Sequence, residues 1–199
     1  MNEFIQLIKN RRTNYVLSNE KIVSEKEIEQ IIKDAIKYVP TAFNIQSSKV
    51  VVLFNEQHEN LWDIVKRILQ KRISPQAFIK TEQKINSSFR SGYGTIMFFD
   101  DTDLTKQLQT NYPSYKDNFP IWAEQANGML QFTIWTALCN KGLGVSLQHY
   151  NPIIDDEVKK NWKIPAHYKL IAQMPFGKPA KKPLSKTFEP LESRIKIYK

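Results

Sequence analysis

The chain has 199 residues, 41% of them hydrophobic and 12% aromatic, with a net charge of +9 and a single cysteine. About 200 residues of this composition fit one folded domain and exclude a wholly disordered chain. One cysteine excludes a disulfide scaffold and any zinc or iron–sulfur site built on several cysteines. It fits a reducing compartment, and we expect a soluble, cytoplasmic protein.

Apolar periodicity and capping signals predict four helices and one strand in the first half of the chain. The strand, at residues 49–54, is rich in β-branched side chains and is expected to be buried on both faces. The helices are expected at residues 3–10, from the capping box at 24–27 to Pro40, at 61–69, and from 75 to about 89.

The second half of the chain predicts strands alternating with helices, ending in an exposed tail. Strands are expected at 95–99, 145–147, 168–174 and 194–198, and a turn at 176–179. Helices are expected within the acidic segment 100–118, from about 121 to 140, and after Asn151-Pro152. The whole pattern indicates an α+β fold in which helices predominate. A strand at the extreme C-terminus often pairs with a second subunit.

The charge of the chain is dispersed along the sequence. Residues 66–90 and 178–199 are basic, whereas residues 100–125 are net acidic, and no nucleic-acid-binding motif accompanies them. We therefore expect attraction for small anionic ligands and no nucleic-acid partner. The longest purely apolar runs, 50–54 and 96–99, are far below the roughly 20 residues that span a bilayer, and the N-terminus does not read as a secretory signal. No membrane partner is expected.

Conventional catalytic sets are nearly absent from the sequence. His58, His149 and His167 are not at metal-ligand spacing, so no metal site is expected. Ser146 lacks the second glycine of a nucleophile elbow. Cys139 lies within the predicted long helix, which favours a buried small hydrophobe over a nucleophile.

Polar loops remain as candidate ligand-binding segments. Arg11 and Arg12 directly follow a predicted helix, and a guanidinium pair suits phosphate oxygens, although the pair also fits a basic helix end. Asn44 and Gln46 offer amides that can bind the edge of a flat heterocycle or merely satisfy the backbone. Residues 148–151 are dense in polar and aromatic groups, where a simple turn is the alternative.

The order of these segments resembles the nitroreductase family. The resemblance rests on Arg11-Arg12-Thr13-x-Tyr15, on residues 40–46, on residues 142–152 and on residues 176–179. It extends over essentially the whole chain and is greatest for the fatty-acid-repression-mutant-type, oxygen-insensitive branch. It implies an FMN-containing homodimer with a central, mainly antiparallel sheet flanked by helices. A C-terminal extension, about residues 187–199, would add a strand to the sheet of the other subunit.

The resemblance also implies which residues bind FMN. Asn44 and Gln46 would reach the flavin from the second subunit, whereas Gln148 and His149 would lie beside the isoalloxazine ring. The full set is Arg11, Arg12, Thr13, Tyr15, Asn44, Gln46, Gln148, His149 and Lys186. Many relatives carry a basic residue in place of Phe188, and an acid and a glycine in place of Gln148 and His149. The neutral amide predicts a changed reduction potential or nicotinamide preference.

The implied activity is an NADH- or NADPH-dependent reduction of nitroaromatics or quinones in a ping-pong cycle carried by FMN. No side chain then needs to act as a nucleophile. Five aromatic residues either line the opening for flat acceptors or merely pack: Phe43, Tyr112, Tyr115, Phe119 and Trp122. One alternative is a flavin-binding stress-response or lipid-signalling regulator with little turnover. A basic nucleic-acid-binding module ranks last, because the basic residues lie in separated segments.

Overall fold

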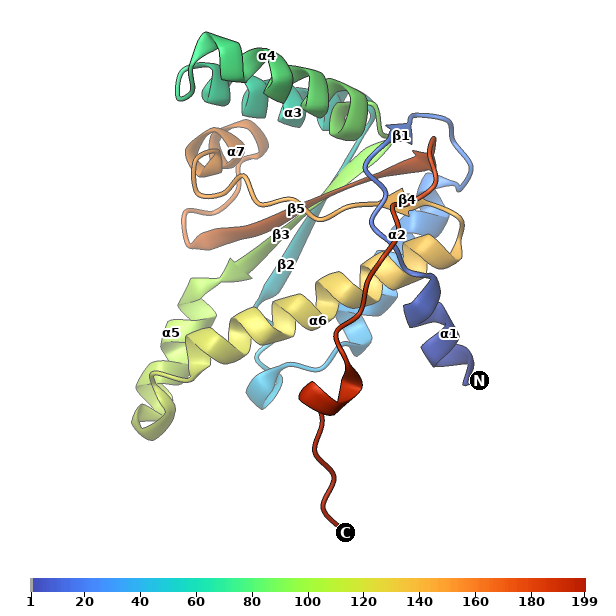
Figure 1. The fold of residues 1–199 in the computed structure, drawn as a ribbon. Coiled ribbons are helices and arrows are strands. Elements are labelled where there is room, and N and C mark those ends of the chain that lie inside the picture. Colours follow the sequence, from blue (N-terminus) through green and yellow to red (C-terminus); the bar gives the residue numbers. More distant parts are fainter. Residues whose placement is uncertain (1) are drawn as a thin grey trace.

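Five strands form the sheet at the centre of residues 2–199, the part of the chain that the computed structural model describes (Figure 1). Strand β3 (Gly94–Asp101) lies between β2 (Ser48–Phe54) and β5 (Tyr168–Pro179), and both neighbours are antiparallel to it. The two-residue strands β1 (Leu17–Ser18) and β4 (Gly144–Val145) pair antiparallel with β5. The predicted mainly antiparallel sheet is confirmed.

Two helices begin where capping signals predict, whereas the helix predicted at residues 61–69 begins earlier, at Asn55, and the one predicted from 75 to about 89 changes to a π-helix at Ile85. The Ser24 hydroxyl accepts a hydrogen bond from the Glu27 amide at 3.2 Å, and Pro75 opens a later helix whose N-cap is Ser74. The α-helices are α1 (Glu3–Asn10), α2 (Glu25–Tyr38), α3 (Asn55–Gln70), α4 (Pro75–Lys84), α5 (Thr102–Asn111), α6 (Phe119–Asn140) and α7 (Asp155–Trp162). Short helical turns are η1 (Ala42–Asn44), η2 (Ile85–Arg90, a π-helix), η3 (Pro113–Tyr115) and η4 (Leu191–Ser193).

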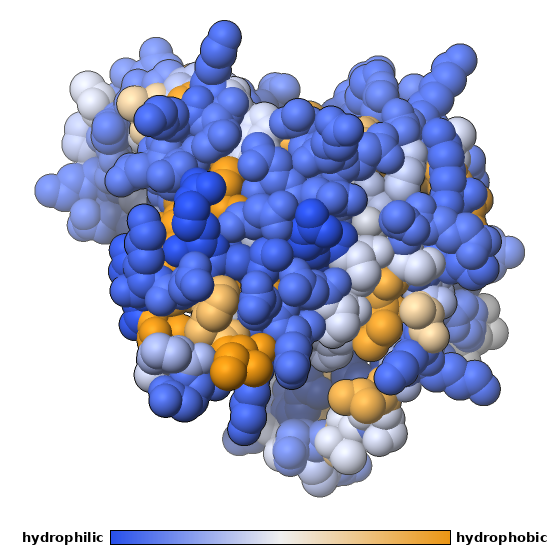
Figure 2. Space-filling model, turned by 90° about the horizontal axis from the view of Figure 1, so that it is seen from above, coloured by the Kyte–Doolittle hydropathy of each residue, from blue (hydrophilic) through white to orange (hydrophobic). Residues whose placement is uncertain are grey.

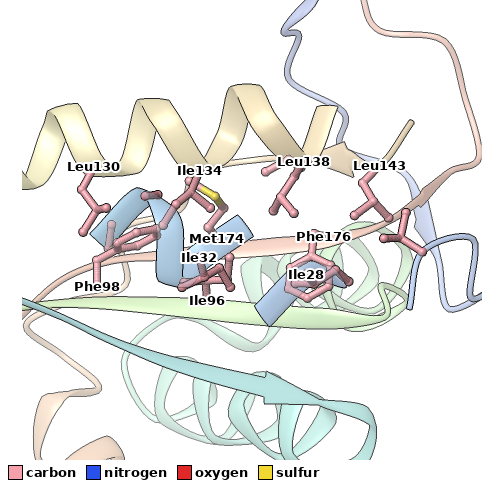
Figure 3. Close-up of a cluster of buried hydrophobic side chains, with 14 of the residues drawn as sticks. Ile28, Ile32, Ile96, Phe98, Leu130, Ile134, Leu138, Leu143, Met174 and Phe176 are labelled. Atoms are coloured by element: carbon pink, nitrogen blue, oxygen red, sulfur yellow. The ribbon is translucent and has the colours of Figure 1, made fainter. Parts of the chain in front are cut away.

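Helices cover both faces of the sheet, and strand alternation sends successive side chains to opposite layers. On one face, Ile96 and Phe98 of β3 pack with Ile28 of α2 and with Ile134 and Leu138 of α6 (Figure 3). On the other face, Met97 and Phe99 pack with Leu61 and Trp62 of α3, Phe89 of η2 and Val158 of α7. The two layers are therefore built from neighbouring residues of a single strand.

The turn predicted at residues 176–179 is wrong, because β5 continues through it to Pro179. Phe176 is fully buried, and its neighbour Gly177 lies against β1, where an added Cβ would meet the Ser18 carbonyl oxygen at 2.5 Å. The glycine permits close approach of two backbones. Gly177 and Pro179 are therefore part of a strand that packs closely on β1, although glycine and proline near each other usually indicate a turn.

Two further expectations need correction. Strand β2 is at the edge of the sheet, and only Leu53 of its seven residues is fully buried, so burial on both faces is wrong. The apolar run at 49–54 belongs to a half-covered edge strand. Residues 194–198 form no strand within the single chain, where the tail has only the short turn η4. The pairing of this tail with a second subunit stays a prediction.

The surface is uneven in polarity. The face seen from above, on the α3 and α4 side of the molecule, is mostly hydrophilic with small separate apolar spots (Figure 2). Within residues 2–199, no helix combines the length and apolar character needed to cross a bilayer.

Candidate cofactor site

A cavity of about 640 Å³ lies between the N-terminal segment, α6 and the segment that follows β5. Its volume is within the roughly 300–1,000 Å³ typical of small-molecule and cofactor pockets. Five of the residues that are predicted from the sequence to bind FMN line this cavity: Arg11, Arg12, Thr13, Tyr15 and Lys186. The structure thus brings the N-terminal and C-terminal ends of the predicted set to one place.

Backbone pairing explains how these distant segments meet. The Asn14 amide donates to the Val145 carbonyl at 2.9 Å, and Thr13 forms a parallel bridge with the same residue. The Ala180 amide donates to the Val16 carbonyl at 2.9 Å, and the Arg12 guanidinium donates to the Leu184 carbonyl. The N-terminal segment is therefore held between β4 and the segment after β5.

The cavity is cationic at one side. The Arg11 guanidinium lies 4.5 Å from the centroid of the Trp135 ring, a cation–π contact that fixes its position. Among the described residues, Arg11, Arg12 and Lys186 form no ion pair with a carboxylate. Three cations without acidic partners around one cavity favour an anionic ligand such as a phosphate.

The opposite wall of the cavity comes from α6, which the sequence did not nominate. Gly128, Gln131, Phe132 and Trp135 of this helix line it, and Leu147 adds a further apolar side chain. A Cβ atom added at Gly128 would meet no other atom within 4 Å, so the space beside this glycine is open. The signal in the sequence is a long helix of 22 residues in which Glu124 is the single charged residue.

Cys139 lies close to this site without being part of its lining. Its Sγ is 3.9 Å from the Arg12 carbonyl oxygen, and burial raises the pKa of the thiol. A thiol kept protonated is a weak nucleophile. The structure therefore favours the interpretation of Cys139 as a small hydrophobe, although the residue is partly rather than fully buried.

Gln148 and His149 do not line the cavity, although Leu147 directly before them does. Gln148 exchanges backbone hydrogen bonds with Gln173 at 2.7 and 2.9 Å, and its Nε2 donates to the Ser146 hydroxyl at 3.2 Å. The side chain of His149 is exposed. Their predicted role beside the flavin ring stays a prediction.

Asn44 and Gln46 also lie away from this cavity, on the loop between α2 and β2. Three residues of that loop, Phe43, Asn44 and Gln46, have positive φ angles of 51–54° although none is a glycine. Left-handed backbone costs of order 1–3 kcal/mol for such residues and persists only where the surroundings fix it. In the resemblance these amides serve a second subunit, so their position in one chain leaves that role a prediction.

An aromatic cluster holds this loop. The centroid of the Phe43 ring lies 4.9 Å from that of Tyr112, 5.3 Å from that of Phe119 and 6.2 Å from that of Trp122. Tyr115 completes the cluster at 6.3 Å. Such pairs contribute about 0.5–1.5 kcal/mol each beyond the burial of their area. The contacts therefore offset the backbone strain to a comparable degree.

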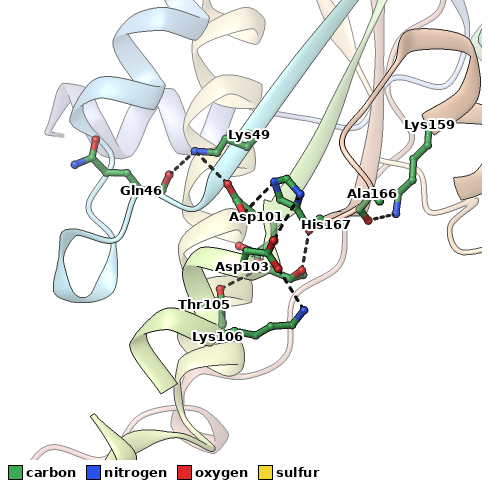
Figure 4. Close-up of polar contacts among 11 residues, drawn as sticks. Gln46, Lys49, Asp101, Asp103, Thr105, Lys106, Lys159, Ala166 and His167 are labelled. Atoms are coloured by element: carbon green, nitrogen blue, oxygen red, sulfur yellow. Dashed lines mark hydrogen bonds and ion pairs between the residues drawn. The ribbon is translucent and has the colours of Figure 1, made fainter. Parts of the chain in front are cut away.

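A polar cluster fixes the other end of the loop (Figure 4). The Lys49 ammonium donates to the Gln46 carbonyl oxygen at 3.3 Å and lies 3.9 Å from the buried Asp101 carboxylate. His167 lies between two carboxylates, 3.7 Å from Asp101 and 3.7 Å from Asp103. This network connects the loop to the end of β3.

The cavity is compatible with FMN on three grounds. It has the volume of a cofactor pocket, its cations lack acidic partners, and Phe132 and Trp135 give it a flat apolar wall. A phosphate binds to cations of this kind, and a planar heterocycle packs on a flat apolar wall.

Comparison with known proteins agrees with this chemistry. Residues 8–178 match the model of the nitroreductase family. Two Saccharomyces cerevisiae proteins are similar over nearly their full length. HBN1 is 35% identical over 198 residues, covering 98% of this chain and 96% of HBN1, and nitroreductase FRM2 is 31% identical over 197 residues, with the same coverage.

Solved structures show the same fold. Nitroreductase CinD from Lactococcus lactis, in complex with chloramphenicol, superposes with a TM-score of 0.91 and is 37% identical, covering 98% of this chain and 100% of CinD. An FMN-bound nitroreductase from Desulfitobacterium hafniense has a TM-score of 0.72 and 19% identity, with 100% of each chain covered. The predicted fold class is confirmed by these neighbours.

Proposed function

Because the chain belongs to the nitroreductase family, we propose that it is an FMN-dependent oxidoreductase that uses NADH or NADPH to reduce nitroaromatics or quinones. The observation that carries the proposal is the cavity of about 640 Å³ lined by Arg11, Arg12 and Lys186, cations that form no ion pair within residues 2–199. When bound, FMN supplies the redox chemistry, accepting hydride from the nicotinamide and delivering electrons to the acceptor in a ping-pong cycle.

In this proposal the side chains of the protein bind FMN, orient it and enclose it. Arg11, Arg12 and Lys186 hold the phosphate, because guanidinium and ammonium groups without acidic partners bind it most strongly. Thr13 and Tyr15 line the same side and orient the ligand, and Phe132 and Trp135 pack on its apolar part. Gln148 and His149, which follow the lining residue Leu147 without lining the cavity themselves, would contact the edge of the ring. No side chain has to act as nucleophile or general base.

We also propose a homodimer that completes each site. The outward face of α6 exposes Ile121, Met129 and Phe132, and the exposed C-terminal tail carries Ile195 and Ile197. The exposed apolar residues of this helix and this tail, which are some of those on the surface, support association with a second copy. Residues 187–199 would then pack on the partner, and Asn44 and Gln46 would reach the partner's flavin.

Flat aromatic electron acceptors are the proposed substrate class. CinD, at 37–38% identity, has been crystallised with chloramphenicol and with 4-nitrophenol. These complexes support a site in this chain that accepts small nitroaromatic molecules. The single cysteine supports the proposed location in the reducing cytoplasm.

The test is an absorption spectrum of the purified protein, followed by anaerobic addition of NADH or NADPH. The proposal predicts bound-flavin bands that bleach on addition of the nucleotide and return with a nitroaromatic or a quinone. Flavin bands that persist would favour a flavin-binding regulator with little turnover. A protein that stays colourless with excess FMN would contradict both.

A further inference from the structure

The loop at residues 41–47 is the most strained part of the chain that the structure describes outside glycine positions. Phe43, Asn44 and Gln46 all have left-handed backbone within four residues. Only two non-glycine residues elsewhere in residues 2–199, Asn55 and Lys163, share that conformation. Such strain persists where the surroundings over-determine it and is concentrated at functional sites.

Two independent anchors over-determine this loop. At its first half, the Phe43 ring is packed in the aromatic cluster of η3 and α6, stacked on Trp122 at an interplanar angle of 17°. At its second half, the Thr41 hydroxyl accepts a hydrogen bond from the Gln46 amide at 3.1 Å, and Lys49 holds the Gln46 carbonyl. The first anchor holds the Phe43 ring, and the second holds the backbone of Gln46.

The amide side chains between the anchors remain available. Asn44 and Gln46 are exposed, and the Gln46 side chain makes only a 3.4 Å contact with the Asn44 carbonyl. Figure 4 shows the Gln46 amide group directed away from the polar cluster that holds its backbone. The loop therefore presents two amides in a fixed arrangement without using them internally.

We propose that Phe43 is a positioning residue, whose ring locks the left-handed loop in the conformation that presents Asn44 and Gln46 to the flavin site of a second copy. The inference rests on the proposed function, because it assumes that the cavity of the partner holds FMN. Without the ring, the competent loop conformation is only one of several. Apparent affinity falls in proportion to the population of the competent state.

Replacement of Phe43 separates the ring from the strain. Phe43→Ala removes the ring and keeps the strained backbone, whereas Phe43→Gly removes the ring and relieves the strain, because glycine adopts φ near 54° freely. Phe43→Tyr keeps the ring. Tyr38→Ala, which removes an aromatic ring that is 71% exposed on α2, is the matched control.

The measurements are the FMN dissociation constant by fluorescence titration and the melting temperature of the apoprotein. Phe43→Ala and Phe43→Gly are both expected to raise the dissociation constant about tenfold, and Phe43→Tyr and Tyr38→Ala to leave it within about twofold. Phe43→Gly should melt at or above Phe43→Ala. A dissociation constant that follows the melting temperature across the variants would overturn the inference, since the ring would then be only structural.

Mixed dimers test whether the loop acts on the partner. The chain with Phe43→Ala is co-expressed with a chain carrying Arg11→Ala and Arg12→Ala, and the heterodimer is isolated with two affinity tags. The Phe43→Ala chain then offers an intact cavity, and the other chain offers an intact loop to it. With FMN held well below the wild-type dissociation constant, one complete site of two predicts about half of the wild-type turnover. The Phe43→Ala homodimer should then give about a tenth, and the homodimer without the two arginines little.

The outcomes distinguish this inference from the proposed function. A heterodimer no more active than its parents would mean that the loop serves its own chain, which overturns the inference while leaving FMN binding intact. A wild-type protein that binds no FMN overturns both. Unchanged FMN affinity and turnover in Phe43→Ala overturns the inference alone.

Discussion

The helices α3 and α6, on opposite faces of the sheet, differ in the charge of their outer surfaces. On one side of the sheet, α3 carries five charged residues in sixteen, Glu56, Glu59, Asp63, Lys66 and Arg67, and Arg90 pairs with Glu59 and Asp63 at 2.9 Å. On the other side, α6 carries one charged residue in twenty-two and exposes Ile121, Met129 and Phe132. We call the α3 layer closed, because α3 carries charged side chains on its outer surface. The outer surface of α6 instead exposes those three apolar side chains beside Glu124, its single charge.

This difference indicates where the molecule makes its contacts. The cavity lies against α6, the helix that exposes these apolar side chains, and its three cations form no ion pair within residues 2–199. The inner face of α6, with Leu130, Ile134 and Leu138, belongs to the core as α3 does, whereas its outer face is the surface for which we propose binding. Substitutions in the core and on this outer face should therefore separate the free energy of unfolding from the affinities for FMN and for a second copy.

The largest effect on unfolding is expected from Trp62→Ala in the closed layer. Trp62 is fully buried, and its indole N–H donates to the Thr95 hydroxyl at 3.0 Å. The substitution should lower the free energy of unfolding by about 3–5 kcal/mol in urea titrations. Ile121→Ala, on the exposed side of α6, should change it by less than about 0.5 kcal/mol in the single chain. Equal losses would contradict the division between the packed core and the outer face of α6.

Acid should destabilise the closed layer through His58. Its ring is fully buried against Thr95 at 2.7 Å and the Arg90 carbonyl at 3.2 Å, and burial lowers its pKa from 6.5 to about 4. The unfolded chain binds the proton first, so stability contributed by neutral His58 is lost as pH falls from about 6.5 towards 4. The loss reaches about 3 kcal/mol. Urea unfolding measured across this range checks it, and a flat profile in wild type would contradict it.

A smaller effect, confined to cofactor affinity, is expected from Arg11→Ala. Loss of one charge-assisted hydrogen bond to phosphate costs about 1.5–3 kcal/mol, which is roughly 10–150-fold in the FMN dissociation constant. Lys9→Ala is the matched control, because this cation is in the last turn of α1, two residues before Arg11, but does not line the cavity. Unchanged FMN content in purified Arg11→Ala would remove Arg11 from the site.

The smallest free-energy effect is expected from Met129→Ala, which truncates the exposed face of α6. Alanine is at least as good a helix former as methionine, so the fold of the single chain should be unaffected. If this face contacts a second copy, about 1–2 kcal/mol of association energy is lost. Sedimentation over a dilution series measures the change. Ile79→Ala, at an exposed position of α4, should leave association unchanged.

Local signals predicted the elements well where one physical cause decides the structure. The Ser24 cap, the shared face of Ile28 and Ile32, and Gly142 after α6 all match the structure, because capping and periodicity act within a few residues. The turn predicted at residues 176–179 and the burial of residues 49–54 on both faces are wrong because neither is decided by local residues. Whether a glycine turns or packs, and whether a strand is central or at the edge, depends on segments far away in the chain.

The candidate site divides in the same way. Arg11, Arg12 and Lys186 were nominated by residue chemistry and resemblance, and the structure brings them to one cavity. Phe132 and Trp135 were not nominated, because residues inside a helix carry no local mark of a ligand beyond their apolar character. Asn44 and Gln46 cannot be assigned from one chain, since their predicted partner is a second copy.

The central claim is that α6 and the adjacent cavity are completed by FMN and a second copy. Sedimentation velocity of the purified protein, detected both at the protein band and at the visible flavin band, tests both parts in one experiment. The account predicts one boundary at about twice the chain mass of 23.3 kDa, carrying about one flavin per chain. A colourless boundary at the mass of a single chain, unchanged by added FMN, would contradict it.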